Sequence, residues 1–318
     1  MAEIGTDIIK AKRLLEANEL VAIPTETVYG LAGNAFEGSA VSKIFEVKNR
    51  PSFDPLIAHT NSLEKVRGFV KEIPPAAEKL AKAFWPGPLT LLLPKNKLVP
   101  DLVTSGLDTL AVRIPNHSLT LSLLEKLDFP LAAPSANPFG YISPTRASHV
   151  EEQLGDKIPY ILDGGSCHIG IESTIIGFEG RQTIIYRMGG KSVEEIEKIA
   201  GKVKIKPHSS SNPKAPGMLK SHYAPTKDVI LGNIHQLLPK YNKEEVAILS
   251  FSDSFEEIPE ERQIILSPKK DLSEAAQKLF WALRRLDKLN IRYILTELVP
   301  NKGLGRGIND RLQRASVK

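Results

Sequence analysis

Short apolar runs alternate with helical patterns along the first two thirds of the chain. Apolar residues at helical spacing predict a helix over residues 6–18, capped by Thr6 or Asp7, and further helices near 39–47, 62–71, 76–84, 117–126 and 145–154. Between them, apolar runs predict strands near 20–23, 56–58, 89–93, 110–114, 131–133, 161–162, 173–176 and 183–186. Not every predicted strand is followed by a helix, so the pattern predicts an α/β fold with a mixed sheet.

The last third of the chain has a more regular alternation. Residues 206–217 are rich in proline, serine and lysine, as linkers are. Beyond them, strands are predicted at 229–231, 246–250, 264–266 and 293–296, with helices near 234–240 and 272–289 and a final helix after Gly303–Gly307. We therefore predict a domain over 1–205, a linker over 206–226 and a small three-layer α/β domain over 227–318.

The composition is that of an ordinary globular protein. The chain has 318 residues, of which 42% are hydrophobic, and no apolar run approaches the ~20 residues that span a bilayer. The first residues lack the basic and apolar pattern of a signal peptide. The single cysteine, Cys167, forms no intrachain disulfide and has no CxxC partner for zinc. We expect a cytoplasmic protein that does not contact membranes.

Charge is unevenly distributed along the chain. Residues 1–200 carry 21 Lys and Arg against 24 Asp and Glu, whereas residues 201–318 carry 21 against 13. A basic C-terminal third is compatible with a surface that faces nucleic acid. Solvated faces of helices explain the same excess, and we favour this second interpretation.

Familiar nucleotide and hydrolase motifs are missing from the sequence. No GxxxxGK[ST] phosphate loop occurs, and Gly303-Leu304-Gly305 lacks the third glycine of the dinucleotide fold because position 308 is isoleucine. The chain also has no HExxH metal motif and no GxSxG nucleophile elbow. Cys167-His168 alone is too little for a metal site, so we predict no protein-held metal. A nucleotide enzyme with this sequence needs a less common phosphate site.

Polar clusters instead fall at the ends of predicted strands, where α/β sheets bind ligands. The clusters are 24–30, which contains Thr25, Glu26 and Thr27; 48–59, which contains Lys48 and Arg50; 109–115; 132–145, which contains Ser135 and Ser143; and 170–176 with Arg187. Arg113 lies inside an apolar strand and needs an anionic partner, which is either a ligand or a structural carboxylate. Taken singly, the last two clusters also fit an ordinary turn and an ordinary strand start.

Together these clusters favour a site for oxyanions. Four cations suit phosphates or carboxylates, namely Lys48, Arg50, Arg113 and Arg187, and hydroxyls surround them. No nucleophile and base pair accompanies them. Such a site works by positioning and by stabilising charge, as nucleotidyl transfer does.

At these clusters the chain resembles the L-threonylcarbamoyladenylate synthases, the YrdC-like family, in their long two-domain form. The resemblance runs through 24–30, 48–59, 109–115, 133–137 and 172–174, and continues at 215–218, 221–225 and 309–315. It covers nearly the whole chain. Two departures are small: Asp54 stands where asparagine is common, and 307–309 varies the usual ending. The resemblance implies a YrdC-like twisted mixed sheet around a concave cavity, with a Rossmann-like C-terminal domain.

The resemblance also implies a reaction and a set of partners. The family condenses L-threonine, bicarbonate and ATP, supplied with Mg²⁺, into threonylcarbamoyl-AMP and pyrophosphate. A partner enzyme then transfers the threonylcarbamoyl group to tRNA. Carried over by motif, the threonine-binding residues are Thr27, His59, Arg113 and Ser173. The ATP-binding residues are Arg50, Asp54, Thr109, Ser135, Ser143, Arg187 and Tyr223, and Lys48 is expected to act with Arg50 in catalysis.

Several points stay open at this level. His59 is a candidate general base, but a neutral hydrogen-bonding role for its ring is the interpretation we favour. Residues 216–225 are expected to fold over the nucleotide as a lid. Two alternatives are a carbamoyl-adenylate domain of hydrogenase maturation, which needs zinc fingers that one cysteine does not provide, and a non-catalytic RNA-binding module.

Overall fold

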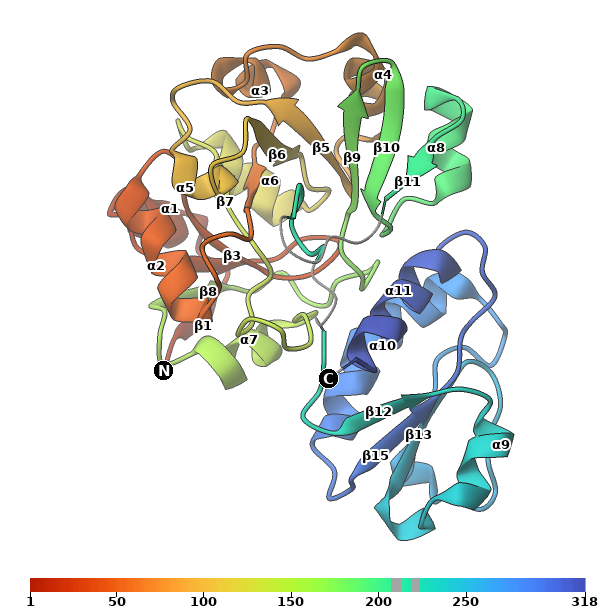
Figure 1. Cartoon of the computed structure of the whole chain (residues 1–318). Helices are drawn as coiled ribbons and strands as arrows, with labels where there is room; N and C mark the ends of the chain where they lie inside the picture. The colour runs from red at the N-terminus through yellow and green to blue at the C-terminus, as the bar shows by residue number, and fades with distance from the viewer. Residues whose placement is uncertain (207–212, 219–222, 318) are drawn as a thin grey trace.

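The computed structural model describes residues 1–206, 213–218 and 223–317. Within them the strands form two sheets, one of 11 strands and one of four, which lie in two units joined by the linker (Figure 1). The larger sheet ends at Ile205 and the smaller begins at Asp228. Of the predicted linker, residues 207–212 and 219–222 lie outside the described residues.

The large sheet has the strand order β1-β8-β2-β3-β7-β4-β6-β5-β9-β10-β11. Its strands are β1 Glu3–Gly5, β2 Val21–Ile23, β3 Gly30–Asn34, β4 Ile57–His59, β5 Leu89–Pro94, β6 Thr109–Arg113, β7 Leu131–Ala132, β8 Tyr160–Leu162, β9 Thr174–Glu179, β10 Gln182–Arg187 and β11 Lys204–Ile205. Strand β2 pairs in parallel with β8 and antiparallel with β3. The prediction of a mixed sheet is confirmed.

Helices surround this sheet. They are α1 Ile8–Glu16, α2 Gly38–Lys48, α3 Leu63–Phe69, α4 Pro75–Phe84, α5 Asp101–Thr104, α6 Ser118–Glu125, α7 Ala147–Leu154 and α8 Val193–Ala200. The cap of α1 is Asp7, whose carboxylate accepts from the amides of Ile9 and Lys10. Helix α8 was not predicted, although Ser192 and Glu195 form a capping box at its start.

The small sheet is parallel and has the order β12-β15-β13-β14. Its elements are β12 Asp228–Leu231, α9 Ile234–Leu237, β13 Val246–Ser250, β14 Gln263–Ile265, α10 Leu272–Asp287, β15 Tyr293–Thr296 and α11 Gly305–Ala315. Helices α10 and α11 lie between this sheet and the larger unit, while α9 lies on the other side (Figure 1). The predicted three-layer arrangement is therefore present.

Close backbone packing joins the two units. A side chain at Gly170 would meet the backbone of Ala276 and Gln277 in α10, and one at Gly307 would touch Ile171 and Gly189. Polar contacts reinforce this packing: the Tyr141 hydroxyl lies 2.6 Å from the Asp287 carboxylate. Helices α10 and α11 thus rest directly on the larger unit.

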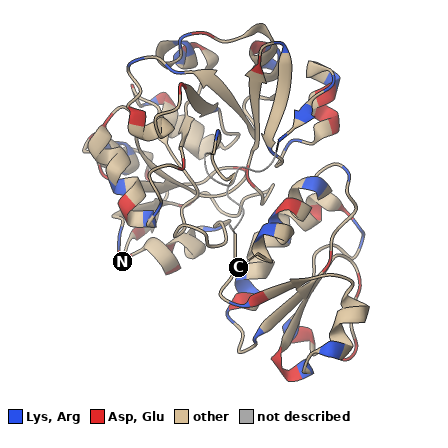
Figure 2. Cartoon of the chain, viewed as in Figure 1, with Lys and Arg blue, Asp and Glu red and all other residues tan. Residues whose placement is uncertain are grey.

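Charged residues of both signs are distributed over the outer elements. Figure 2 shows Lys and Arg interspersed with Asp and Glu on the C-terminal unit. Arg284, Arg311 and Arg314 are buried, so these three arginines do not belong to solvated helix faces. Among the described residues, no helix combines the length and the apolar character that crossing a bilayer requires.

Candidate active site

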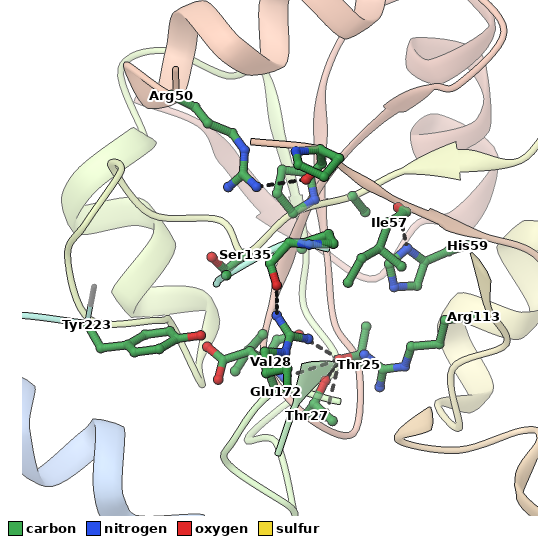
Figure 3. A pocket seen from close by; sticks show the side chains of 17 residues that line it. Thr25, Thr27, Val28, Arg50, Ile57, His59, Arg113, Ser135, Glu172 and Tyr223 are labelled. Atoms are coloured by element: carbon green, nitrogen blue, oxygen red, sulfur yellow. Dashed lines mark hydrogen bonds between the residues drawn. The ribbon is translucent and has the colours of Figure 1, made fainter. Parts of the chain in front are cut away.

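A small cavity lies where several strands of the large sheet end. Its wall includes Thr25, Thr27, Arg50, His59, Arg113, Ser135, Glu172, Arg187 and Tyr223. In Figure 3, His59 and Arg113 lie together on one side of the cavity, and Arg50 and Tyr223 lie on the other. Seven of the residues predicted from the sequence therefore converge here, from segments spread over some 200 positions of the chain.

The turn after β2 is held by its own hydroxyl groups. The Thr25 hydroxyl donates to the carbonyl oxygen of Val28 at 2.6 Å and accepts from the amides of Thr27 and Val28. The hydroxyls of Thr25 and Thr27 lie 2.9 Å apart. Such a side-chain turn fixes the backbone without a helix or a strand. Thr27 is thereby placed in the cavity wall.

Arg113 has both a structural partner and access to the cavity. Its Nη2 atom lies 2.8 Å from the Glu26 carboxylate, and both side chains are almost fully buried. Glu26 therefore compensates its charge, and its Nε atom donates to the carbonyl oxygen of Gly87 at 3.3 Å, while the arginine also lines the cavity. Glu26 had no assigned role in the sequence.

His59 ends strand β4 beside Arg113. Its Nδ1 atom lies 3.1 Å from the carbonyl oxygen of Ile57. Burial, and then the charge of Arg113, lower the pKa of His59 to about 3. A ring that stays neutral at pH 7 and binds protons this weakly is a poor general base but a competent hydrogen-bonding group.

Arg50 is aimed into the cavity by the end of helix α2. Asn49 takes a left-handed conformation, with φ of 51°, and terminates the helix. The Arg50 guanidinium then forms a buried ion pair with Asp54 at 2.8 Å and donates to the carbonyl oxygen of Pro55 at 2.9 Å. Asp54 does not line the cavity, so the structure places it behind Arg50.

Lys48 also lies behind the cavity wall. Its ammonium group donates to the carbonyl oxygens of Ser135 and Asn137 and is fully buried. Burial, with the nearby charge of Arg50, lowers the pKa of Lys48 well below its ordinary value. The lysine predicted to act in catalysis is therefore positioned to hold the loop that carries Ser135.

Arg187 and Ser173 form a second bonded group. The Arg187 guanidinium donates to the carbonyl and the hydroxyl oxygen of Ser173, both at 3.0 Å, and to the carbonyl of Pro216 at 3.4 Å. The Ser173 hydroxyl also lies 2.7 Å from that of Thr90. Ser173 thus lies one layer behind Arg187 and orients it.

Ser143 does not line the cavity but binds Glu172, which does and whose role was not predicted. The Ser143 hydroxyl donates to one carboxylate oxygen of Glu172 at 2.5 Å. The other oxygen accepts from Arg311 of helix α11 at 2.9 and 3.1 Å. A residue of the C-terminal unit therefore contacts a residue that lines the cavity.

Thr109 lies in a neighbouring hollow of about 680 Å³. Thr109, Ala111 and Arg113 share one face of β6, because side chains two positions apart point the same way. Arg113 lines the first cavity, Ala111 packs in an apolar cluster with Ala215 and Met218 of the linker, and Thr109 lines the second hollow. The linker thus crosses the face of the sheet between the two.

Tyr223 closes the cavity from the side of the C-terminal unit. The centroid of its ring lies 5.5 Å from that of Phe280. The guanidinium carbons of Arg311 and Arg314 lie 5.3 and 5.9 Å from the centroid of the Tyr223 ring. Its φ of 68° is unusual for a tyrosine. The packing of two helices therefore holds this residue in a strained conformation.

The described residues contain no group of three or more His, Cys, Asp or Glu side chains that could hold a metal ion. Glu172 is the carboxylate that lines the cavity, and Arg311 and Ser143 occupy both of its oxygens.

Comparisons with known proteins agree with this geometry. The Sua5/YciO/YrdC family model, described as telomere recombination, matches residues 13–189, and the model described as the C-terminal domain of threonylcarbamoyl-AMP synthase matches residues 191–317.

Two curated relatives match nearly the whole chain. The threonylcarbamoyl-AMP synthase of Pyrococcus abyssi is 44% identical over 96% of this chain and 93% of its own, and that of Bacillus subtilis is 38% identical over 97% and 92%. A crystal structure of P. abyssi Sua5 complexed with L-threonine is 42% identical, with a TM-score of 0.93 over 99% of this chain and 97% of that one. The chain therefore belongs to the Sua5/YciO/YrdC family, in the form that carries the threonylcarbamoyl-AMP synthase C-terminal domain.

Proposed function

We propose that this protein is an L-threonylcarbamoyladenylate synthase, a nucleotidyltransferase that condenses L-threonine, bicarbonate and MgATP into threonylcarbamoyl-AMP and pyrophosphate. The observation that carries the proposal is the two-sided cavity, in a chain whose relatives bear this name and whose structural neighbour is complexed with L-threonine. The product would serve a partner enzyme that modifies tRNA.

The chemistry divides between the two sides of the cavity. Arg113, whose charge Glu26 compensates, would bind the threonine carboxylate. The neutral ring of His59 and the hydroxyl of Thr27 would form further hydrogen bonds to threonine on the same side of the cavity. The amine of threonine attacks bicarbonate, or carbon dioxide derived from it, to form a carbamate, and water is lost. Because His59 is a weak base, we expect the amine to lose its proton to solvent before the attack; in model peptides an α-amine has a pKa of about 8.

A carbamate oxygen would then attack the α-phosphate of ATP, and pyrophosphate leaves. Negative charge grows on the phosphate oxygens in this step. Arg50 and Arg187 are held in the wall by bonds to Pro55 and Ser173 and would stabilise that charge without reorganising. Lys48 would keep Ser135 in place through the backbone of its loop.

The linker residues support the lid hypothesis. With Pro216, Gly217 and Tyr223 in the wall, the first cavity encloses only about 50 Å³, much less than the ~300 Å³ or more of a typical ligand site. If the linker segment 213–218 moved away from the sheet, the cavity would join the hollow that contains Thr109. ATP would therefore bind with the linker displaced, and the linker would close over it. Residues 219–222 of the proposed lid lie outside the described residues.

The decisive assay measures pyrophosphate release from MgATP, with threonine and bicarbonate each omitted in turn. The proposal expects release only when all three are present. Release without threonine would contradict it. Salt-sensitive RNA binding without any turnover would support the non-catalytic alternative instead.

The lid has its own test, a chain from which residues 208–225 are deleted. We expect this variant to fold and to have lost synthesis, because the adenylate would be exposed to water. Full activity would refute the lid.

A further inference from the structure

Glu172 is an acidic residue in a cavity that is expected to receive a polyanion. It lies two residues before the start of strand β9 and lines the wall together with Arg187 and Tyr223. Figure 3 shows its carboxylate near the Tyr223 hydroxyl, on the side of the cavity away from Arg113. A carboxylate at this position would repel phosphates unless another group compensated its charge.

Arg311 supplies that compensation from helix α11. Its side chain is fully buried, and its Nε and Nη2 atoms donate to the same oxygen of Glu172 at 3.1 and 2.9 Å. Its Nη1 atom donates to the carbonyl of Met188. The ring of Tyr223 lies against the guanidinium. Arg311 thus touches two residues of the cavity wall, although it belongs to the other unit.

The charges at the cavity show why this contact matters. Among the described residues, the catalytic unit places Arg50, Arg113 and Arg187 in the wall, while Asp54 pairs with the first, Glu26 pairs with the second and Glu172 lines the wall itself. These six charges cancel, and the buried Lys48 lies behind the same wall. Helix α11 then adds Arg311 and Arg314 against one carboxylate, that of Asp310, which contacts both. The C-terminal unit therefore adds net positive charge beside the cavity.

The protonation states agree with this arrangement. Burial acts to raise the pKa of Glu172, but the charges of Arg311 and Arg187 and the Ser143 hydroxyl outweigh it and hold this pKa below its ordinary value. Burial acts to lower the pKa of Arg311, whereas Tyr223, Glu172 and Asp310 raise it overall. Both groups are therefore charged at neutral pH.

We propose that Arg311 is a positioning residue for the nucleotide: it neutralises and orients Glu172, so that the C-terminal unit completes the phosphate side of the site. The proposal rests on the function proposed above. Under this proposal the C-terminal unit contributes electrostatically to nucleotide binding, through Glu172, and does not contribute to threonine binding.

The test compares five forms of the full-length protein: wild type, Arg311→Met, Glu172→Gln, the double variant, and Arg306→Met. Arg306 is the matched control, because it lies on the same helix and pairs with Glu194 of the larger unit at 2.6 Å, away from the cavity. Calorimetry measures the affinity of each form for the Mg²⁺ complex of the β,γ-imido analogue of ATP, for pyrophosphate and for L-threonine. Thermal unfolding is recorded alongside.

We expect Arg311→Met to weaken analogue binding about tenfold or more, because a buried carboxylate is left uncompensated. The affinity of Arg311→Met for L-threonine should change by less than about twofold. Arg306→Met should change each measured affinity by less than about twofold, because its ion pair is partly exposed. The double variant should recover analogue affinity to within about threefold of wild type, since glutamine still accepts from Ser143 but carries no charge.

Equal analogue affinity in Arg311→Met and wild type would overturn the proposal. So would a double variant no better than Arg311→Met, which would mean that Arg311 only stabilises the fold. If wild type binds the analogue but releases no pyrophosphate with threonine and bicarbonate, the proposed reaction fails while the role of Arg311 stands. If wild type binds L-threonine but neither the analogue nor pyrophosphate, the nucleotide site itself is refuted, and this proposal with it.

Discussion

The two sides of the cavity are built in different ways. On the side proposed to bind threonine, Arg113, Glu26 and His59 all belong to the large sheet and the turns at its strand ends, and the charges of Arg113 and Glu26 compensate each other within that unit. On the side proposed to bind the nucleotide, Glu172 is compensated by Arg311, and Tyr223 is held by Phe280 and by two arginines of α11. The first side is complete in one domain, whereas the second depends on how two domains dock.

The two kinds of construction suit different tasks, namely binding a small substrate and closing over a large one. A rigid, internally paired site suits a small substrate that must be held in one orientation. A wall shared with a linker and a second domain suits a large substrate that must enter before water is excluded. The contrast predicts that changes on the two sides have separable effects.

The largest expected effect is the loss of an arginine from the cavity wall. Arg113→Met should lower kcat/KM for threonine by about 100-fold or more, because a buried charged hydrogen-bonding group is removed. Arg187→Met should instead raise KM for ATP more than KM for threonine. Steady-state pyrophosphate release with each substrate varied measures both. The variant Glu26→Gln/Arg113→Met, which leaves no unpaired buried carboxylate, controls for folding.

Near-normal turnover in Arg113→Met would contradict the assignment of the threonine side. Arg50→Ala and Ser173→Ala extend the test, since each should reduce product formation severely while leaving the fold intact. If Arg113→Met and Arg187→Met raise the same KM, the two-sided division of the cavity is wrong.

A large effect on stability is expected for Glu26→Gln. It leaves the buried Arg113 guanidinium without a counter-charge, which should lower the free energy of unfolding by about 3 kcal/mol. Glu78→Gln is the matched control, because Glu78 pairs with Arg67 and Lys82 at the surface. Urea denaturation of both variants gives the comparison. Equal midpoints for the two would show that the buried pair contributes no more than an exposed one.

The histidines give a smaller, pH-dependent effect. Burial lowers the pKa of His59 to about 3 and that of His149 to about 4, from 6.5 in an unfolded chain. As the pH falls below 6.5, the unfolded chain therefore binds protons that the folded protein does not bind until pH 3 to 4. Stability should thus be complete above pH 6.5 and decline towards pH 5.

Denaturation midpoints at pH 5 and pH 7.5 check this decline, and His59→Gln should make it shallower. An unchanged slope in that variant would show that His59 has the same pKa in the folded protein as in the unfolded chain. The same histidine should leave no inflection near pH 6.5 in the pH profile of kcat/KM for threonine. That profile should keep rising above neutral pH as the amine of threonine loses its proton.

The smallest effect is expected where the linker meets the surface of the large sheet. Lys214 lies 3.6 Å from the Glu179 carboxylate, and 64% of its side chain is exposed. Glu179 also pairs with Lys206 at 2.8 Å, so Lys214→Met should change kcat by less than about twofold. A much larger loss, measured in the pyrophosphate assay, would show that this exposed pair controls the lid.

Local patterns predicted most elements because apolar periodicity reports burial directly. They missed β3, in which three of the residues Gly30–Asn34 are glycine or alanine and which carries no strand pattern; it is a strand because β2 and β7 pair with it on either side. They missed α8 as well, whose capping box was present in the sequence. Pairing partners distant in the chain supply what short windows lack.

The candidate site shows the same limit. Polar residues at strand ends indicated where ligands bind, and seven of the predicted residues share one cavity. Their division of labour was not visible: Lys48 holds a loop, Asp54 pairs with Arg50, and Ser143 acts through Glu172. Glu26 and Glu172 lay inside the highlighted clusters, but nothing in the sequence distinguished a ligand-binding carboxylate from one that compensates an arginine.

The sequence by itself determined the fold class, the family and the positions at which polar groups interrupt apolar strands, because these depend on local pattern and motif order. The tertiary structure alone decided which charges meet. Arg311 and Glu172 are 139 positions apart and form a fully buried pair, because helix α11 packs against the strand ends of another domain. Electrostatic energy depends on the distance between charges in space, and that distance cannot be read from their separation along the chain.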